Sequence, residues 1–162
     1  MTATGGSKSV QQLVDDHYSV LYRYAFRLAG GQEDASDLVQ ETFLKAQAQL
    51  AQLRDSSRAR SWLFTILRNC YLQRLRSNKN HREVTLDDAM MVSTNPSPPS
   101  EISSAELQKA LSELPESFRT PVILFFFEEF SYRDIAEQLD LPMGTVMSRL
   151  ARAKAYLRRR LS

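Results

Sequence analysis

Apolar residues recur every three or four positions along most of this chain, and that spacing restricts the possible folds more than any other feature. Between Val10 and Gly30 they follow the period of one helix face, and Gly30-Gly31 then ends the pattern. Few segments alternate with period two between turn signals, as β-strands do. The sequence therefore predicts an all-α protein.

Two further helices are predicted in the first half of the chain, from about Glu33 to Leu53 and from near Ser57 to about Arg76. The helical pattern is then lost until about Ser103. Within the gap, the segment VSTNPSPPS (Val92–Ser100) holds three Pro, three Ser and no charge, a composition that favours extended or disordered backbone.

These boundaries predict two small helical domains, at residues 8–78 and 103–162, joined by a flexible linker at residues 79–102. In the second domain Ile123, Leu124, Phe126 and Phe127 are expected to form the core. Pro121 is expected to kink its helix, or to restart it with Thr120 as the cap.

Several classes of protein are excluded by composition. With one cysteine, Cys70, no internal disulfide can form. The start of the chain lacks the apolar core of a signal peptide, and the longest apolar run, Val122–Phe127, is too short to cross a bilayer. We therefore expect a cytoplasmic protein that does not insert into membranes.

Catalytic chemistry and metal binding are not expected either. Cys70, His17 and His81 are isolated in the sequence and lack the spacing of metal ligands. The chain has no Gly-rich phosphate loop and no suggestion of a Ser/His/Asp set. The sequence thus predicts a protein that acts by binding, without metal or other cofactor.

Charge is arranged in blocks along the chain. Residues 54–82 hold eight Lys or Arg and one acid, residues 83–117 hold one Lys and seven acids, and residues 141–162 hold six Lys or Arg and no acid. Two basic blocks on either side of an acidic one could meet a polyanion in two places. Solvated helix faces give the same pattern, so charge alone leaves nucleic-acid binding open.

The segment SYRDIAEQLDLPMGTVMSRLARAK (Ser131–Lys154) predicts two short helices with a tight corner between them. Ser131 and Asp134 form a capping box, Asp140 suits the corner, and Pro142 suits the start of the last helix. The inner stripe of that helix is predicted to be Val146, Leu150, Ala153 and Leu157. This is the helix-turn-helix pattern, in which the second helix enters the major groove; the alternative is a helical hairpin with a basic face.

Two stretches of the first domain allow more than one interpretation. DASDLVQETFLKA (Asp34–Ala46) is, on its residues alone, best explained as an ordinary amphipathic helix. Arg58–Arg76 interleaves arginine with aromatic residues, which suits single-stranded nucleic acid because bases stack on rings while guanidinium groups hold phosphates. Trp62 and Phe64 could equally be core residues.

Taken together, three motifs resemble the small, two-domain extracytoplasmic-function (ECF) sigma factors of bacterial RNA polymerase. DLVQETFLKA resembles the helix that binds core polymerase, and SWLFTILRN resembles the start of the helix that recognises the −10 element. LPESFRTPVILFFFEEFSYRDIAEQLDLPMGTVMSRLARAKAYLR resembles the domain that recognises the −35 element. The likeness covers almost the whole chain.

The resemblance implies a protein that binds core RNA polymerase through the β′ coiled coil and the β flap, directs transcription from promoter DNA, and is controlled by an anti-sigma factor. The polymerase-binding residues it implies are Asp37, Gln40, Glu41 and Phe43. Those implied for the −10 element are Arg60, Ser61, Trp62, Arg68, Asn69, Gln73, Arg74 and Arg76. Those implied for the −35 element are Arg133, Thr145, Met147, Ser148, Arg149, Arg152 and Lys154.

Two positions depart from the family's pattern. Gln73 stands where Asp is common, and Met147 stands where Lys or Arg is frequent. A thioether cannot donate a hydrogen bond to guanine, so one −35 contact is expected to be apolar or absent. Both departures concern the promoter sequence and not the family.

Two other functions are compatible with parts of the sequence. A stand-alone helix-turn-helix regulator would explain residues 131–154, but it gives no role to the Arg-aromatic helix or the linker. A helical interaction module, such as an anti-sigma antagonist, would use the basic faces for protein contacts. Salt-dependent DNA binding, by the protein alone or only with polymerase, separates the three functions.

Overall fold

The computed structural model describes residues 8–78 and 102–162. Every regular element within those residues is helical, which confirms the predicted all-α class. The chain divides into two compact units, Met1–Lys79 and Asn80–Ser162. His81 and all of the predicted linker except Ile102 lie outside the described residues.

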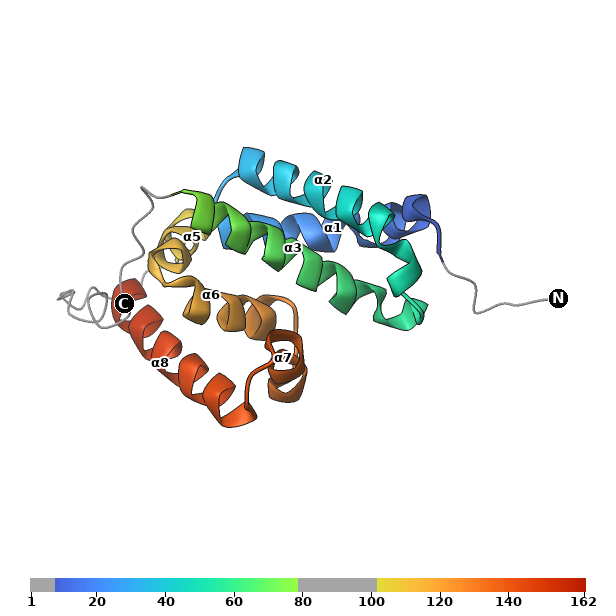
Figure 1. Cartoon of the computed structure of the whole chain (residues 1–162). Coiled ribbons are helices and arrows are strands. Elements are labelled where there is room, and N and C mark those ends of the chain that lie inside the picture. The colour runs from blue at the N-terminus through green and yellow to red at the C-terminus, as the bar shows by residue number, and fades with distance from the viewer. Residues whose placement is uncertain (1–7, 79–101) are drawn as a thin grey trace. The chain divides into compact units, whose positions relative to one another are not determined.

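The first unit is built from three helices that pack against one another (Figure 1): α1 (Val10–Ala29), α2 (Gln32–Ala48) and α3 (Ala59–Ser77). Gly30 ends α1 in the left-handed region at φ 85°, as the Gly-Gly pair predicts. α2 is shorter than expected, because it ends at Ala48 and a 3₁₀ turn at Leu50–Gln52 replaces its predicted last turn. A second 3₁₀ turn, at Ser56–Arg58, directly precedes α3. These turns bring the side chain of Leu53 back into the core.

Aromatic and aliphatic side chains fill the centre of this unit. The ring of Tyr24 on α1 stacks on that of Phe64 on α3, with the ring centroids 4.5 Å apart. Phe64 is fully buried, so this residue belongs to the core and does not stack on nucleic-acid bases. Trp62 is only partly buried and remains accessible on the surface of α3.

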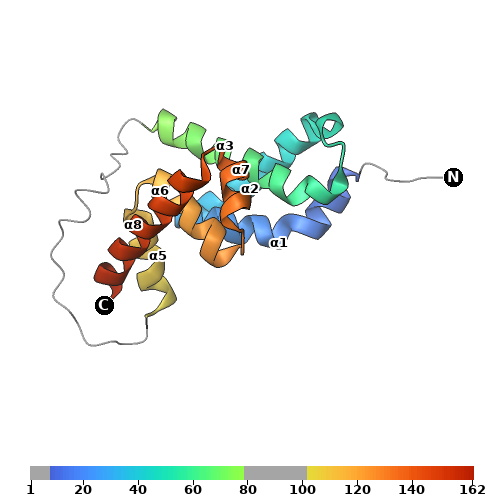
Figure 2. The same ribbon diagram turned by 90° about the horizontal axis from the view of Figure 1, so that it is seen from below.

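The second unit contains α5 (Ser104–Glu113), α6 (Glu116–Val122), a π-helical turn (Ile123–Phe127), α7 (Tyr132–Leu139) and α8 (Met143–Leu161). α5 and α6 both pack against α8 (Figure 2). The predicted capping box is present, because the Ser131 hydroxyl accepts from the Asp134 amide and Asp134 accepts from the Ser131 amide. Asp140 forms the corner at φ 54°, and Pro142 caps α8.

The helix around Pro121 differs from its prediction. Pro121 lies inside α6, and the chain then widens into the π-helical turn without restarting. Proline has no N–H to donate to the carbonyl one turn earlier, which disturbs the α-helical ladder at this point. The alternative with Thr120 as a cap is wrong: its hydroxyl donates instead to Glu116 Oε1 at 2.6 Å, inside the protein.

A buried arginine closes the end of α5. The Arg119 guanidinium donates to the carbonyl oxygens of Leu111 (3.0 Å), Ser112 (3.3 Å) and Leu114 (2.6 Å). The last carbonyls of a helix have no partner within it, and a cation at this end also suits the helix dipole. Arg119 therefore stabilises the α5–α6 corner, a role that the sequence pattern did not indicate.

A second polar cluster joins α5 to α8. Glu113 accepts from the Tyr156 hydroxyl at 2.8 Å and from Arg160 at 2.8 and 3.1 Å. Tyr156 is buried while Leu157 is partly exposed, so the inner stripe of α8 includes a tyrosine that the prediction omitted. Burial, followed by the neighbouring carboxylate, raises the pKa of Tyr156 to about 12. The hydroxyl therefore remains a donor at any physiological pH.

Opposing effects act on Glu113. Burial raises its pKa, but the hydrogen bonds from Arg160 and Tyr156 and the charge of Arg160 lower it more, so the net pKa lies below that of an ordinary glutamate. A carboxyl whose pKa is depressed on folding stabilises the protein above its unfolded pKa, and this contribution is lost as the pH falls through the folded value.

Replacing Glu113 by Gln should lower the free energy of unfolding at neutral pH by about 1 kcal/mol, because charge-assisted hydrogen bonds become neutral ones. The melting temperature of the full chain, measured across pH, should show this difference near pH 7 and lose it well below the 4.5 of an ordinary glutamate. Glu137→Gln, at an exposed position of α7, is the control. An equal difference in strong acid would contradict the assignment.

Candidate functional site

The outward side of α8 carries most of the residues implied for the −35 element. Met147, Ser148 and Arg152 are exposed, with Met147 49% exposed, while Thr145 and Arg149 are half-buried at the edges. Val146 and Leu150 between them are buried, which fixes the rotation of the helix. Arg133 is exposed at the start of α7, the first helix of the pair.

Arg152 lies over an aromatic ring of the neighbouring helix. Its guanidinium carbon is 5.3 Å from the ring centroid of Phe118 on α6. A cation over a ring face is attracted by the ring's quadrupole. This contact is made by the guanidinium itself, on a side chain that is otherwise exposed.

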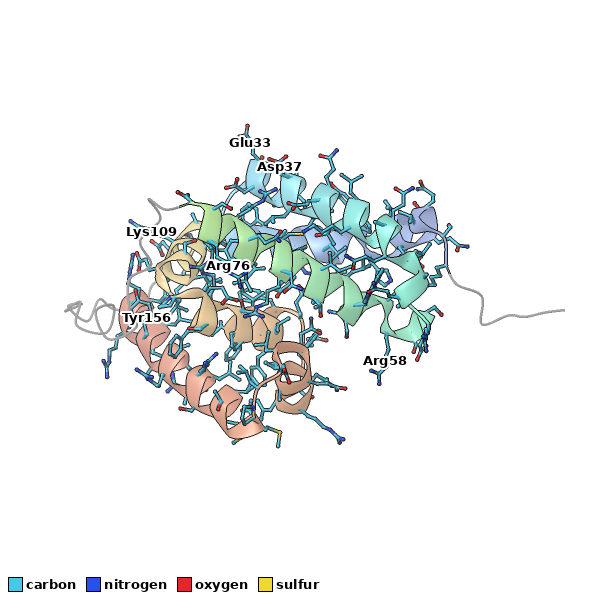
Figure 3. All side chains as sticks on the ribbon, in the orientation of Figure 1. Glu33, Asp37, Arg58, Arg76, Lys109 and Tyr156 are labelled. Atoms are coloured by element: carbon cyan, nitrogen blue, oxygen red, sulfur yellow. The ribbon has the colours of Figure 1, made fainter. Side chains whose placement is uncertain are left out.

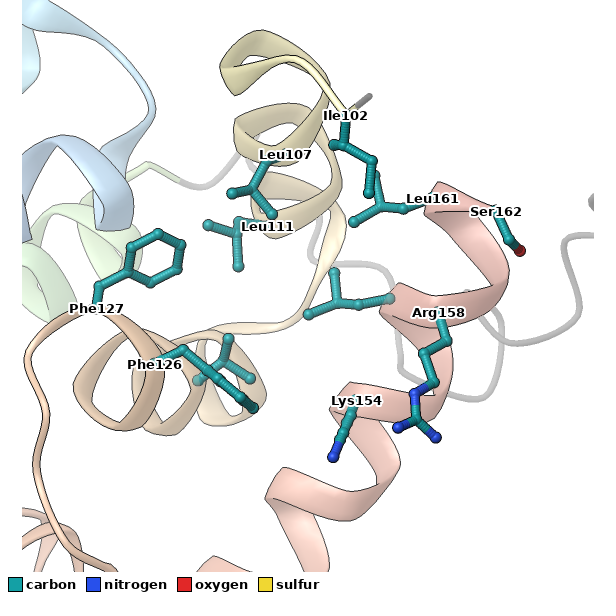
Figure 4. Close-up of a pocket in the computed structure, with 11 residues that line it drawn as sticks. Ile102, Leu107, Leu111, Phe126, Phe127, Lys154, Arg158, Leu161 and Ser162 are labelled. Atoms are coloured by element: carbon teal, nitrogen blue, oxygen red, sulfur yellow. The ribbon is translucent and has the colours of Figure 1, made fainter. Parts of the chain in front are cut away.

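Lys154 lies two turns beyond Met147 on the same side of α8, away from the side that carries Thr145 and Ser148. It lies at the rim of an apolar groove (Figure 4), together with Arg158. The groove encloses about 500 Å³, and its apolar walls come from Ile102, Leu107, Leu111, Val122, Phe126, Phe127, Leu157 and Leu161. Because α8 turns by about 100° per residue, Lys154 cannot share the face of Ser148.

Phe126 is the clearest correction to the predicted core. It is 50% exposed and lines this groove, whereas Ile123 and Leu124 are buried as expected. The π-helical turn changes the angular spacing of the side chains, and this turns the Phe126 ring outward. Phe127, the other predicted core residue, is only partly buried and also lines the groove.

On α3 the structure separates the implied −10 residues into two groups. Ser61, Trp62, Arg68, Asn69 and Arg76 recur at spacings of seven and eight and share one side of the helix. Arg60 and Arg74 lie on other sides. The Arg60 guanidinium carbon is 5.4 Å from the centroid of the Phe64 ring.

Arg74 and Gln73 belong to a polar cluster between α2 and α3. Arg74 Nη2 is 3.2 Å from Glu41 Oε2, and Lys45 Nζ is 3.7 Å from Glu41 Oε1. Lys45 also donates to Gln73 Oε1 at 3.0 Å. Cys70 is buried beside this cluster, and burial raises the pKa of its thiol.

The same cluster joins residues that the resemblance assigned to two functions. Glu41 was implied for polymerase binding, and Gln73 and Arg74 for the −10 element. From the sequence, only the spacing of four between Glu41 and Lys45 on one helix could have indicated a contact within this cluster. The partners on α3 are about 30 positions away in sequence, so no local pattern signals the pairing.

The outer side of α2 carries an acidic and amide surface. Asp37 and Gln40 are exposed, and Glu33 and Asp37 both project from α2 one turn apart (Figure 3). Phe43 is only 8% exposed, and it lines a shallow depression between α1 and α2 with Val14 and Tyr18. Of the four implied polymerase-binding residues, Asp37 and Gln40 are therefore the most accessible.

Comparison with known proteins identifies the family. The Sigma-70 region 2 profile matches residues 13–81, and the Sigma-70 region 4 profile matches residues 104–157. The chain is 33% identical to RNA polymerase sigma factor SigV of Bacillus subtilis, over 92% of this chain and 89% of that protein. It is 35% identical to ECF RNA polymerase sigma factor SigL of Mycobacterium tuberculosis, over 92% and 86%.

The chain belongs to the ECF sigma factors of the sigma-70 family. This confirms the resemblance found in the sequence and does not favour either alternative function. Another relative, ECF RNA polymerase sigma factor SigE of Mycolicibacterium smegmatis, is 34% identical over 96% of this chain, which spans 64% of that protein's length.

Solved structures agree with this assignment. The sigma factor RpoE from Bartonella quintana, in complex with the anti-sigma factor NepR, superposes with a TM-score of 0.73 at 29% identity, covering 93% of this chain and 95% of RpoE. CnrH, solved in complex with the cytosolic domain of CnrY, gives 0.65 at 26% identity, covering 92% and 84%.

Two further properties of this sigma factor concern its described parts. Within residues 8–78 and 102–162, His, Cys, Asp and Glu side chains form no group of three or more that could hold a metal ion. None of the helices in those ranges is long and apolar enough to cross a membrane.

The groove of the second unit should bind small aromatic anions. An anilinonaphthalene sulfonate dye fits its chemistry, because the apolar walls accept rings while Lys154 and Arg158 attract the sulfonate. Phe126→Ser should weaken dye binding roughly fivefold, since part of an apolar wall is removed. Fluorescence titration measures this, and the melting temperature should change little because Phe126 is half-exposed.

Met143→Ser is the matched control for that experiment. Met143 is also 50% exposed but lies at the start of α8, outside the groove. Unchanged dye affinity in Phe126→Ser, or an equal loss in Met143→Ser, would show that the dye binds elsewhere.

Proposed function

We propose that this sigma factor directs promoter-specific transcription with a division of labour between two domains. Residues 8–78 bind core RNA polymerase and the −10 element, residues 103–162 bind the −35 element, and residues 79–102 link them. The protein acts in the cytoplasm by binding alone, without chemistry of its own. The observation that carries the proposal is the exposed basic side of α8 in a capped helix-turn-helix.

In the −35 contact, the N-terminal half of α8 enters the major groove and α7 crosses the DNA backbone. Arg149 and Arg152 suit guanine edges or phosphates, and Thr145 and Ser148 suit several bases. Met147, exposed among them, offers an apolar surface for a thymine methyl group. The position of Lys154 beside the groove supports a phosphate or protein contact for that residue, not a base contact.

In the −10 contact, the shared side of α3 meets DNA whose strands are separating. Trp62 is partly exposed and offers a ring for base stacking, while Arg68 and Arg76 suit phosphates. Ser61 and Asn69 are exposed and can form hydrogen bonds with base edges. The placement of all five residues on one side of α3 supports this assignment.

Contacts with polymerase use a different surface in each domain. The exposed Asp37 and Gln40 on α2 suit a basic surface on the β′ coiled coil, with Glu41 and the edge of Phe43 beside them. The apolar groove of the second domain suits the β flap, because Phe126 and Phe127 offer a ready hydrophobic surface. Tethering both domains to polymerase raises their effective concentration at the promoter.

Regulation by an anti-sigma factor completes the proposal. RpoE from Bartonella quintana is in complex with the anti-sigma factor NepR, and CnrH is in complex with the cytosolic domain of CnrY. A comparable partner would act on this chain by covering its polymerase-binding surfaces. The depression between α1 and α2 and the groove of the second domain are two apolar surfaces that could receive it.

Reversing the charge of Asp37 should weaken assembly of the holoenzyme before DNA is added. Asp37→Lys removes an acid from the proposed contact and sets a lysine against a basic surface, so the affinity for core polymerase should fall at least about tenfold. Fluorescence anisotropy with labelled sigma factor measures it. Glu33→Lys, one turn away on the same exposed side, is the matched control, and an equal loss there would contradict a specific role for Asp37.

Truncating Arg152 should lower promoter-specific transcription while core binding persists. A base or phosphate contact is worth about 1–3 kcal/mol, so Arg152→Ala should reduce promoter affinity roughly tenfold. Run-off transcription and DNA binding by the holoenzyme measure the loss. Arg159→Ala removes an exposed arginine near the other end of α8 and should have less effect. Parallel loss of core binding in Arg152→Ala would overturn the assignment.

A further inference from the structure

Glu41 lies at a junction between the two surfaces that the proposed function assigns to the first domain. Its carboxylate is on α2, the polymerase-binding helix, yet it is paired with Arg74 of α3, the −10 helix. A second cation, Lys45, stands 3.7 Å from the other carboxylate oxygen. One acid is therefore shared by two cations, one from each helix.

The ion pair between Glu41 and Arg74 is exposed enough for another charged group to replace one of its members. The side chains of Glu41 and Arg74 are 34% and 37% exposed, so water still reaches both groups. Ion pairs of this exposure contribute little net free energy, because solvent screens them. Lys45 has a second partner in the Gln73 side-chain oxygen, so the cluster keeps one of its interhelical contacts when Arg74 leaves.

A basic group from a partner protein cannot pair fully with the Glu41 carboxylate while both Lys45 and Arg74 remain beside it. Lys45 and Arg74 together carry two positive charges against the single charge of Glu41, so the cluster is already net positive. A basic group that approaches the same carboxylate is repelled by both cations. It gains the carboxylate fully only if one of them moves away, and Arg74 is the one with no second hydrogen bond among the pairs described.

We propose that Glu41 is an exchange point: core polymerase takes the carboxylate, and the released Arg74 guanidinium then binds a DNA phosphate near the −10 element. The inference rests on the proposed function, because it needs a basic polymerase surface at α2 and DNA along α3. It adds an order of events, since Arg74 is held away from DNA until the holoenzyme has formed.

If Arg74 and core polymerase compete for the Glu41 carboxylate, removing Arg74 should strengthen the binding of core polymerase. Arg74→Met leaves Glu41 without its competing partner, so the affinity for bacterial core polymerase should rise about two- to fivefold, the range of an exposed ion pair. Arg54→Met is the control, because it removes one exposed positive charge from the same unit. Arg74→Gln is the second variant if the methionine variant melts early.

A double-mutant cycle ties the gain to Glu41 itself. In a Glu41→Gln background, Arg74→Met should no longer increase the affinity for core polymerase, because the shared carboxylate is gone. If Arg74→Met and Arg74→Gln bind core no more tightly than Arg54→Met, or if the gain persists with Glu41→Gln, the exchange is wrong. Failure of the unaltered protein to bind core would instead reject the proposed function, and the exchange with it.

The second half of the proposal is tested by the salt dependence of DNA binding. In the holoenzyme, Arg74→Met should reduce the slope of log K against log salt by about 0.7 to 0.9, the value for one phosphate contact. The same substitution should not change the slope for the sigma factor without polymerase, since Glu41 still holds Arg74 there. The release of Arg74 to DNA would be wrong if the slope changed equally in the holoenzyme and in the free sigma factor, or if it did not change in the holoenzyme.

Discussion

The structure depends on one constraint: each small unit has to bury an apolar side of every helix using helices alone. On α8, burial of Val146, Leu150 and Ala153 leaves the opposite side of the helix for binding. On α3, burial of Leu63 and Leu67 does the same. The proposed binding residues are therefore interleaved with core residues along each helix, and a small rotation of either helix would turn the proposed binding side away.

Polar contacts fix those rotations where apolar packing is insufficient. In the second unit, Arg119 satisfies the carbonyls at the end of α5, and Glu113 joins α5 to Tyr156 and Arg160 on α8. Hydrogen bonds have directional preferences that dispersion contacts lack, so they select one arrangement among several of similar packing. The orientation of α8, the proposed recognition helix, thus depends on residues outside the proposed DNA-binding surface.

Electrostatics links the two proposed tasks of the first unit. Acidic residues on α2 and basic residues on α3 suit different partners, and Glu41 and Arg74 pair where the two helices meet. Such a pair is weak because it is exposed, and this weakness is what allows a partner to replace it. A buried ion pair in the same place would stabilise the contact between the helices but could not exchange.

The sequence by itself determined the helical class, the capped corner of the helix-turn-helix and the family, because helix period, capping and motif spacing act over a few residues. Predictions failed where the helix geometry is irregular and where distant segments meet. Phe126 was expected in the core but lines a groove, since the π-helical turn after Pro121 rotates it outward. Lys154 shares the charge of α8, but its position beside an apolar groove, away from Ser148, was not predicted. The Glu41–Arg74 pair joins residues 33 positions apart, and only the packing of α2 on α3 could bring them together.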